Sequence, residues 1–278
     1  MSTALTRQDF GFIRDLLRRR SAIVLETGKE YLAEFRLGIV AKREGFPSLA
    51  ALVAQLRANP HDRLCQTVIE AMTTNETSFF RDQHPFEALR QHILPRLMAH
   101  KGNDHRLSIW CAASSSGQEP YSIAIILREL GLCAPRWDIR FLATDISREM
   151  VTRAREGRYS AMEVNRGLPA PMLAKYFRAT QNRYEVVDEL RNMIEFEELN
   201  LSEAWPAFPA IDLVFVRNVL IYFDTDSKKQ ILGRIRRRMS PHGCLFLGSA
   251  ETTVTLDGEF HKHQHGKAHW YQTSVTPL

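Results

Sequence analysis

Two polar stretches of the sequence contain residue types that could hold a charged ligand. Residues 73–81 read Thr-Thr-Asn-Glu-Thr-Ser-Phe-Phe-Arg, so an acid, an arginine and several small polar side chains share one turn-prone run. Residues 112–122 read Ala-Ala-Ser-Ser-Ser-Gly-Gln-Glu-Pro-Tyr-Ser, between an apolar strand and a predicted helix. Small residues there let the backbone approach a ligand, and the first turn of the helix offers free amide groups. A tight strand-to-helix turn without any ligand has the same composition.

Polar residues also follow two apolar strands predicted further along the chain. Asp145 ends the strand that starts at Trp137, and Arg217 and Asn218 directly follow the strand 211–216. In doubly wound folds an acid at the end of the second strand accepts hydrogen bonds from ribose hydroxyls. Asp145 could instead cap the next helix, and Arg217 could form an ion pair at the edge of the sheet. Together with the two stretches, these residues suggest a nucleotide-like cofactor beside a site that handles a carboxylate.

The histidines and cysteines do not predict a metal site or a disulfide framework. The histidine-rich segment near the C-terminal end has no neighbouring cysteine, and its spacing matches no standard zinc pattern. We expect a solvated loop or an edge strand there, containing His261, His263, His265 and His269. No Cys-x-x-Cys pair is present, so we interpret the cysteines as small buried hydrophobic residues: Cys65, Cys111, Cys133 and Cys244.

Composition places the chain among globular proteins with a substantial core. The 278 residues are 44% hydrophobic and 25% charged, as expected for one large or two modest domains. The net charge of +5 is a mild bias toward acidic partners, and without a long basic tract we do not expect nucleic-acid binding. No apolar run approaches roughly 18 residues and no apolar leader begins the sequence, so we expect no membrane insertion and a cytoplasmic location.

The period of the apolar residues changes along the chain and predicts two domains. Residues 1–72 show helical spacing without a convincing strand, which indicates an N-terminal all-helical domain. Its helices are expected after a cap at Thr6 and over 29–43, 48–58 and 61–72.

Residues 73–278 are expected to form an α/β domain, because strands alternate with helices there. This alternation is typical of a parallel sheet with ligand sites beyond the carboxyl ends of its strands. The expected strands are 107–112, 137–145, 211–216, 244–247 and 268–272, and the expected helices are 118–130, 147–157 and 226–239.

One segment, about 158–197, interrupts the alternation of strands and helices. A helical stretch at 171–177 precedes two short strand-like runs, 184–187 and 193–196. This pattern predicts a hairpin-sized insertion, a small β-subdomain.

Five linked motifs make the chain resemble the chemotaxis receptor methyltransferase family, CheR. They occur in the family's order over nearly the whole chain, and the late segment Gly248-Ser-Ala-Glu251 also fits. The motifs are Asn75-Glu-Thr-Ser-Phe-Phe-Arg81, Trp110-Cys-Ala-Ala-Ser-Ser-Ser-Gly-Gln-Glu-Pro-Tyr-Ser122, Ala143-Thr-Asp-Ile-Ser147, Leu199-Asn-Leu201 and Val216-Arg-Asn-Val-Leu-Ile-Tyr-Phe-Asp224.

The resemblance implies a Rossmann-like, S-adenosylmethionine (SAM)-dependent methyltransferase domain with an N-terminal helical domain and a small inserted β-subdomain. It implies methylation of glutamates on the cytoplasmic helical bundle of chemoreceptors by a monomeric enzyme, with S-adenosylhomocysteine as product. It also implies that Arg81 and Tyr222 are catalytic residues that orient the reacting groups. By motif position, cofactor contacts fall on Asn75, Thr77, Arg81, Glu119, Asp145, Asn200, Leu201, Arg217 and Asn218.

Three further questions remain open at the level of sequence. The insertion of such proteins can dock a receptor's C-terminal tail peptide, or it can be a purely structural hairpin. The chain could methylate another substrate, such as a small molecule or RNA. It could also be a signalling module that binds SAM without catalysis, although an intact Arg81 and Tyr222 argue against that.

Overall fold

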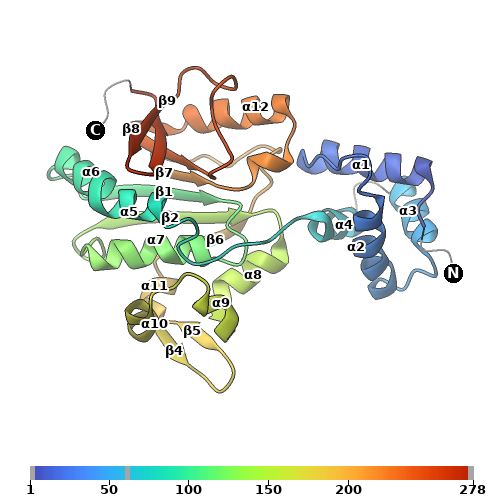
Figure 1. Ribbon diagram of the computed structural model, residues 1–278, viewed down its shortest axis with the longest axis horizontal. Coiled ribbons are helices and arrows are strands. Elements are labelled where there is room, and N and C mark those ends of the chain that lie inside the picture. Colours follow the sequence, from blue (N-terminus) through green and yellow to red (C-terminus); the bar gives the residue numbers. More distant parts are fainter. Residues whose placement is uncertain (1–3, 60–62, 275–278) are drawn as a thin grey trace. The chain divides into compact units, whose positions relative to one another are not determined.

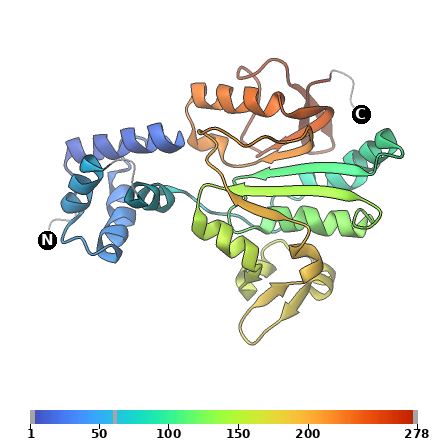
Figure 2. The same cartoon turned by 180° about the vertical axis from the view of Figure 1, so that it is seen from behind.

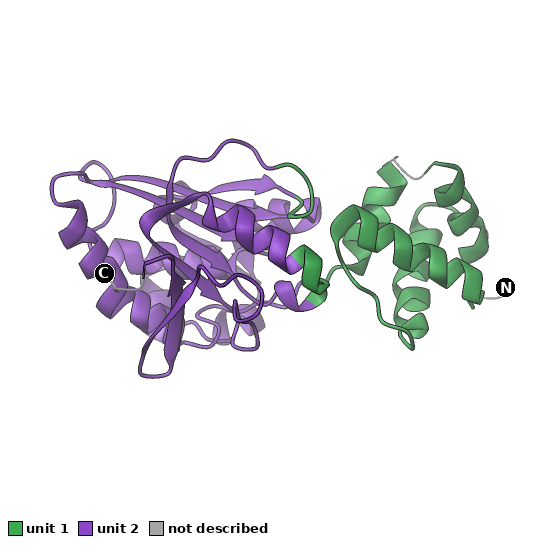
Figure 3. Cartoon of the chain, turned by 90° about the horizontal axis from the view of Figure 1, so that it is seen from above, with its two compact units in different colours: residues 1–74, 200–204, 222–227 green, residues 75–199, 205–221, 228–278 purple. Residues whose placement is uncertain are grey.

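The computed structural model describes residues 4–59 and 63–274, and its chain forms two compact units (Figure 3). The first unit is mainly N-terminal, but it also contains two short segments from later in the sequence. Its residues are 1–74, 200–204 and 222–227, and the second unit contains 75–199, 205–221 and 228–278.

The first unit is helical, as predicted. Thr6 Oγ1 accepts a hydrogen bond from Asp9 N at 3.1 Å, so the expected cap forms, and Ser48 Oγ caps a second helix by accepting one from Ala51 N at 3.1 Å. The last helix was expected from residue 61, and residues 60–62 lie outside the described part of the chain. The helices are α1 (Arg7–Ser21), α2 (Glu30–Arg43), α3 (Leu49–Ala58) and α4 (Arg63–Met72).

A seven-stranded sheet forms the centre of the second unit, in the order β6-β2-β1-β7-β8-β10-β9. The first five strands in that order are parallel, and β10 runs antiparallel to both of its neighbours. The α/β prediction is therefore confirmed. His261, His263 and His265 lie in the edge strand β9, as predicted, whereas His269 lies in β10, which has a neighbour on each side. The strands are β1 (Arg106–Ala112), β2 (Asp138–Asp145), β6 (Glu195–Glu198), β7 (Ile211–Val216), β8 (Met239–Leu247), β9 (His261–His265) and β10 (Ala268–Gln272).

Helices cover both faces of this sheet, with α7 (Gln118–Glu129) below and α12 (Thr225–Arg236) above the central strands in Figures 1 and 2. Successive residues of a strand point to opposite faces of the sheet, so one strand contributes side chains to the hydrophobic core on each face. Phe215 and Phe246 stack at 4.4 Å between ring centroids within the main hydrophobic cluster, which also contains Cys111 and Tyr121. Trp110, beside Cys111 in the strand, stacks instead with Phe208 at 5.2 Å. Burial on both faces explains why β7 is apolar except for Asp212, whose carboxylate binds Lys101 and Ser108 N.

The insertion differs from the prediction in its strand pairing. It forms a three-stranded antiparallel sheet in the order β3-β5-β4, and the run expected to be its second hairpin strand is not part of it. That run becomes β6, which pairs in parallel with β2 of the main sheet. The elements of the insertion are β3 (Arg158–Tyr159), α9 (Ala161–Asn165), α10 (Ala170–Tyr176), β4 (Phe177–Ala179), β5 (Tyr184–Val186) and α11 (Asp188–Arg191).

Two other elements differ from expectation. Residues 84–101, for which no element was predicted, form a continuous helical segment whose middle is a π-helix. The helix expected to reach Met239 ends at Arg236, because Met239 already pairs with Ile211 as the start of β8. The remaining elements are α5 (His84–Ala88), η1 (Leu89–Ile93), α6 (Leu94–Lys101), α8 (Arg148–Glu156) and η2 (Leu220–Tyr222). Among the described residues, no helix is long and apolar enough to cross a bilayer.

Candidate functional site

Asp145 connects the loop after β1 to the start of α8. Its Oδ2 accepts a hydrogen bond from Ser115 N at 2.7 Å, and its Oδ1 accepts one from Ser147 N at 2.9 Å. The residue is 5% exposed, so the carboxylate is held in one position. Each carboxylate oxygen has two lone pairs and can accept a further bond from a ligand hydroxyl. Ser147 and not Asp145 is the N-cap of α8, so the helix-cap alternative for Asp145 is wrong; its carboxylate binds the amide of the cap residue instead.

The loop after β1 also contacts the polar run that follows the first unit. Ser115 Oγ donates a hydrogen bond to Asn75 O at 2.8 Å. Gly117, which begins α7, has φ +95°, and a Cβ there would lie 2.9 Å from Ala154 Cβ. Only glycine fits both the backbone conformation and the close approach of α8. The two polar stretches of the sequence thus meet at the carboxyl end of β1.

Arg217 is the centre of a buried charge network. Its Nη1 lies 2.5 Å from Glu119 Oε2, and its Nη2 lies 2.8 Å from Asp82 Oδ2 and 3.0 Å from Arg81 O. Arg217 therefore does form ion pairs, as one of the two sequence-based alternatives had it, but its side chain is only 1% exposed and it follows a central strand of the sheet. Glu119 Oε1 accepts a hydrogen bond from the Cys111 thiol at 3.2 Å. Burial, followed by the Glu119 charge, raises the pKa of Cys111 well above its usual value, so the thiol stays protonated.

Glu251 fixes the backbone around Asn218. Its Oε2 accepts hydrogen bonds from Asn218 N at 2.8 Å and Gly248 N at 2.6 Å, and its Oε1 accepts one from Ile221 N at 3.2 Å. Asn218 has φ +59°, a conformation that non-glycine residues adopt at a cost. The carboxylate therefore stabilises a strained turn directly after β7 and orients the Asn218 side chain.

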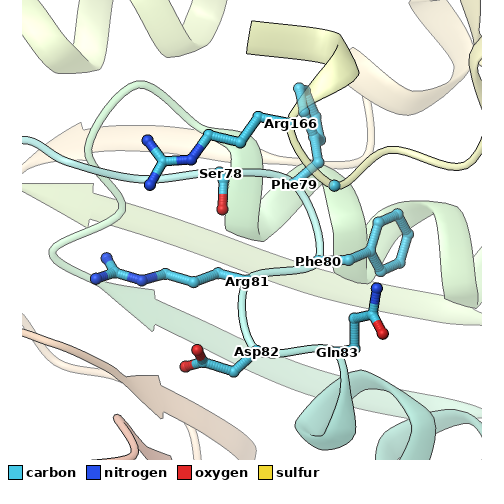
Figure 4. A pocket seen from close by; sticks show the side chains of 8 residues that line it. Ser78, Phe79, Phe80, Arg81, Asp82, Gln83 and Arg166 are labelled. Atoms are coloured by element: carbon cyan, nitrogen blue, oxygen red, sulfur yellow. The ribbon is translucent and has the colours of Figure 1, made fainter.

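Arg81 lines a cavity of about 380 Å³ beside this network. Figure 4 shows its side chain extended from the turn that follows Phe80. The turn is unusual because Phe80, Asp82 and Gln83 all have positive φ. Such strain persists only where surrounding contacts hold it, and here Arg217 binds both Arg81 O and Asp82 Oδ2. The cavity is lined by Ser78, Phe79, Phe80, Arg81, Asp82, Gln83, Arg166 and Gly167.

Two buried polar atoms in this region show that the site suits a polar ligand. Ser114 Oγ and Arg217 Nε have no hydrogen-bond partner among the residues that the structure describes. Buried polar groups are almost always paired, because an unmade bond costs about 1–3 kcal/mol. One atom lies in the loop after β1 and the other directly after β7, two strands that are adjacent in the sheet. A polar cofactor at the carboxyl end of the sheet would supply the missing partners.

Three predicted site residues belong to the first unit. Asn200 Nδ2 donates a hydrogen bond to Arg20 O at 2.6 Å, and Tyr222 O accepts one from Val24 N at 2.8 Å. Leu201 is buried at 6% exposure. Asn200 directly follows Leu199, whose N donates a hydrogen bond to Asp145 O at 2.9 Å.

The other predicted site residues belong to the second unit. Within that unit, the described contacts connect Asn75 with the Asp145 loop and Arg81 with the Arg217–Glu119 pair. Thr77 is half-buried in the polar run between Asn75 and Arg81.

Sequence analysis missed Asp82, Ser114, Arg166 and Glu251 as site residues. Asp82 could have been identified from the sequence, because it directly follows the arginine of the first polar stretch. Glu251 lies in a segment that fitted the family, but its role depends on backbone amides 33 and 30 positions earlier. Local patterns do not contain that information.

A parallel sheet with a carboxylate after one strand, a buried arginine after another and a glycine-started helix between them defines a Rossmann-like, cofactor-binding α/β protein. Residues 75–268 match the model of the CheR methyltransferase SAM-binding domain, and residues 8–73 match that of the CheR methyltransferase all-alpha domain. The chain belongs to the CheR methyltransferase family, and its cofactor is SAM.

Curated relatives are similar over almost their full length. Chemotaxis protein methyltransferase 1 of Pseudomonas aeruginosa is 40% identical over 256 residues, which cover 91% of this chain and 93% of the relative. Chemotaxis protein methyltransferase Cher2 of Pseudomonas putida is 38% identical, with the same coverage. A solved glycopeptide N-methyltransferase, MtfA in complex with SAM, is a distant likeness with 15% identity and a TM-score of 0.34, covering 61% of this chain and 53% of that one.

Proposed function

We propose that this protein transfers a methyl group from SAM to glutamate side chains of chemoreceptors, giving glutamyl methyl esters and S-adenosylhomocysteine. The family supplies the reaction class, and relatives named chemotaxis protein methyltransferase favour a chemotaxis role. The methyl acceptors would lie on the cytoplasmic helical bundle of the receptor, where the methyl esters adjust sensory adaptation. The enzyme would act in the cytoplasm as a monomer.

The contacts of Arg81 are the observation that carries this proposal. Arg217 has two acidic partners, Glu119 and Asp82, within 2.8 Å. Arg81 lines the cavity, yet no carboxylate of the described residues lies within ion-pair distance of it, and its Nη1 donates to Glu76 O at 2.9 Å. A guanidinium presented in this way suits a carboxylate that arrives from outside the protein.

The reaction needs orientation more than acid–base chemistry. A glutamate side chain is already ionised at neutral pH, so no general base is required. SAM supplies a methyl group on a sulfonium: the carboxylate oxygen forms a bond to the methyl carbon, and the electrons of the carbon–sulfur bond remain on sulfur. Arg81 would orient the carboxylate without holding it so tightly that the nucleophile is quenched. Tyr222 would help to position the reacting groups.

Labelled SAM and a panel of receptor cytoplasmic fragments test this function. We expect label to enter the receptor as a base-labile methyl ester. With saturating SAM, Arg81→Ala should lower turnover by at least about tenfold, the scale of one lost orienting contact, and Tyr222→Phe should also slow it. The matched control is Arg106→Ala, which removes an exposed paired arginine at the amino end of β1.

Other outcomes would identify the alternatives. Transfer without any receptor, or into a base-stable product, would indicate another substrate. SAM binding with no transfer to any fragment would indicate a signalling module. Native turnover in both Arg81→Ala and Tyr222→Phe would show that the assigned orienting residues are wrong.

A further inference from the structure

The cavity beside Arg81 has two walls that are far apart in the sequence. One wall is the turn 78–83, and the other is Arg166 and Gly167 from the loop between α9 and α10 of the insertion. Gly167 has φ +95°, and a Cβ there would lie 2.1 Å from Phe79 O. The backbone of the insertion therefore rests directly against the turn that carries Arg81, which keeps Arg166 next to that turn.

Arg166 and Arg81 share one acidic residue. Arg166 Nη2 lies 2.6 Å from Glu76 Oε1, and Arg81 Nη1 donates to the Glu76 carbonyl oxygen at 2.9 Å. The hydrogen bond and charge of Arg166, followed by the charge of Arg81, lower the pKa of the Glu76 carboxyl below its usual value. Figure 4 shows both arginine side chains extending in the same direction beside the cavity.

The charged groups around the cavity differ in their partners. Asp82 also lines the cavity, and its carboxylate binds Arg217 at 2.8 Å rather than either arginine of the cavity. Among the described residues, Glu76 is the one acid that forms an ion pair with Arg166, and no acid forms one with Arg81. Arg166 thus holds one exposed carboxylate and Arg81 holds none, so the guanidinium of Arg81 is left for a carboxylate that arrives from outside.

The Arg166–Glu76 ion pair is solvent-exposed, with side-chain exposures of 60% and 58%. Exposed pairs contribute little to stability, because water and salt screen them and two long side chains must be ordered. Replacing the Glu76 carboxylate with one from a ligand therefore costs little, and Glu76 returns to solvent when it is displaced.

We propose that Arg166 and Arg81 together form a binding site for an acidic peptide segment, and that Glu76 takes the place of a substrate carboxylate in the free protein. This inference rests on the proposed function and refines its substrate class. Arg81 would orient the methyl-accepting glutamate, and Arg166 would bind a second acid on the same helical segment. The insertion thereby contributes a specificity residue to the reaction site itself.

Steady-state kinetics with a receptor cytoplasmic fragment test the assignment. Arg166→Ala should raise KM for the fragment about tenfold. It should not affect the chemical step, so kcat should change by less than about twofold. Glu76→Gln keeps the side chain's size and removes its charge, so KM should fall. Arg106→Ala, an exposed paired arginine at the amino end of β1, should leave both parameters unchanged. Calorimetry should show native SAM affinity in all three variants.

Two results would overturn the proposal. One is an unchanged KM in both Arg166→Ala and Glu76→Gln. The other is a weakened SAM affinity in Arg166→Ala, which would assign Arg166 to the cofactor site instead. In Arg166→Lys, KM should lie between the native value and that of Arg166→Ala, because lysine restores the charge without the planar fork.

A binding measurement separates this inference from the proposed function. A glutamate-rich helical peptide should bind the full chain with an affinity that falls with salt and falls further in Arg166→Ala. If the native protein methylates no receptor fragment, the proposed function fails. If the native protein methylates receptor but binds this peptide no better than Arg166→Ala does, only the acidic-segment site is wrong.

Discussion

The guanidinium of Arg217 and the carboxylate of Glu119 form a buried ion pair, although 98 positions separate them in the sequence. Arg217 follows β7, and Glu119 lies in the first turn of α7, which follows β1. The pairing of β1 with β7 places both residues at the carboxyl end of the sheet. Each charge makes the burial of the other acceptable, since an isolated charge there would be strongly unfavourable.

Removing the charge of Glu119 should weaken both the fold and the cofactor site. In Glu119→Gln, Arg217 keeps only Asp82 as an acidic partner, and Asp82 is itself partly exposed. We expect the free energy of unfolding to fall by about 1–3 kcal/mol, and SAM affinity to fall with it. Denaturant unfolding and calorimetry measure the two effects. Glu149→Gln, which neutralises an exposed acid on α8, is the control, and equal behaviour of both variants would contradict the prediction.

Asp145→Ala should weaken SAM binding by roughly 10- to 100-fold, because charged hydrogen bonds worth about 1.5–3 kcal/mol are lost. Part of the lost affinity would be indirect, because the carboxylate also positions the loop after β1 through its hydrogen bond with Ser115 N at 2.7 Å. Calorimetry on the folded variant measures the SAM affinity. Asp138→Ala removes an exposed acid from the opposite end of the same strand and should bind SAM normally. Native affinity in Asp145→Ala would refute the ribose-binding role.

Gly248→Ala should disturb the turn at Asn218. The new Cβ would lie 2.7 Å from both Asn218 Nδ2 and Glu251 Oε2, so the hydrogen bonds of Glu251 to the turn would have to shift. We expect SAM affinity to fall at least about tenfold, as for one lost charged hydrogen bond. Gly258→Ala is the matched control, because a Cβ there meets nothing within 4 Å. Similar SAM titrations for the two variants would show that the turn does not support the cofactor.

Local sequence patterns predicted the strands and helices that carry the site. The polar residues after β2 and β7 could be identified because a buried apolar run ends directly before each of them. The cap at Ser147 and the stop at Gly157 are likewise local, and both form as expected. The order of the strands then brings Asp145 and Arg217 to the same edge of the sheet.

Pairing between distant segments could not be predicted in this way. The run that became β6 has the same alternation whether it pairs within the insertion or with β2, so its sequence does not choose between them. No element was predicted for residues 84–101, although Leu89, Ile93 and Leu97 lie on one helical face and the segment contains Pro85 and Pro95. Pro85 lies in the first turn of the segment, where its missing N–H costs nothing, and Pro95 lies inside the segment, shortly after the π-helix.

The corrected topology of the insertion changes where a receptor tail peptide would dock. The strand expected at one edge, β5, is the central strand, so the open edges are β3 and β4. β3 has only two residues and its Tyr159 is buried, whereas Arg178 and Ala179 of β4 are exposed. A peptide that adds a strand would therefore pair with β4.

Docking at β4 would tether the enzyme near its substrate glutamates and raise their local concentration without altering the chemistry. We predict that free C-terminal tail peptides from the cognate receptor bind the full chain, and that Arg178→Ala weakens this binding. Titration calorimetry measures both, with a scrambled peptide of the same composition as the control. SAM affinity should remain native in Arg178→Ala, because β4 contributes no residue to the cofactor site described here. No binding up to about millimolar peptide, a strength of only about 4 kcal/mol, would leave the β4 edge with a structural role alone.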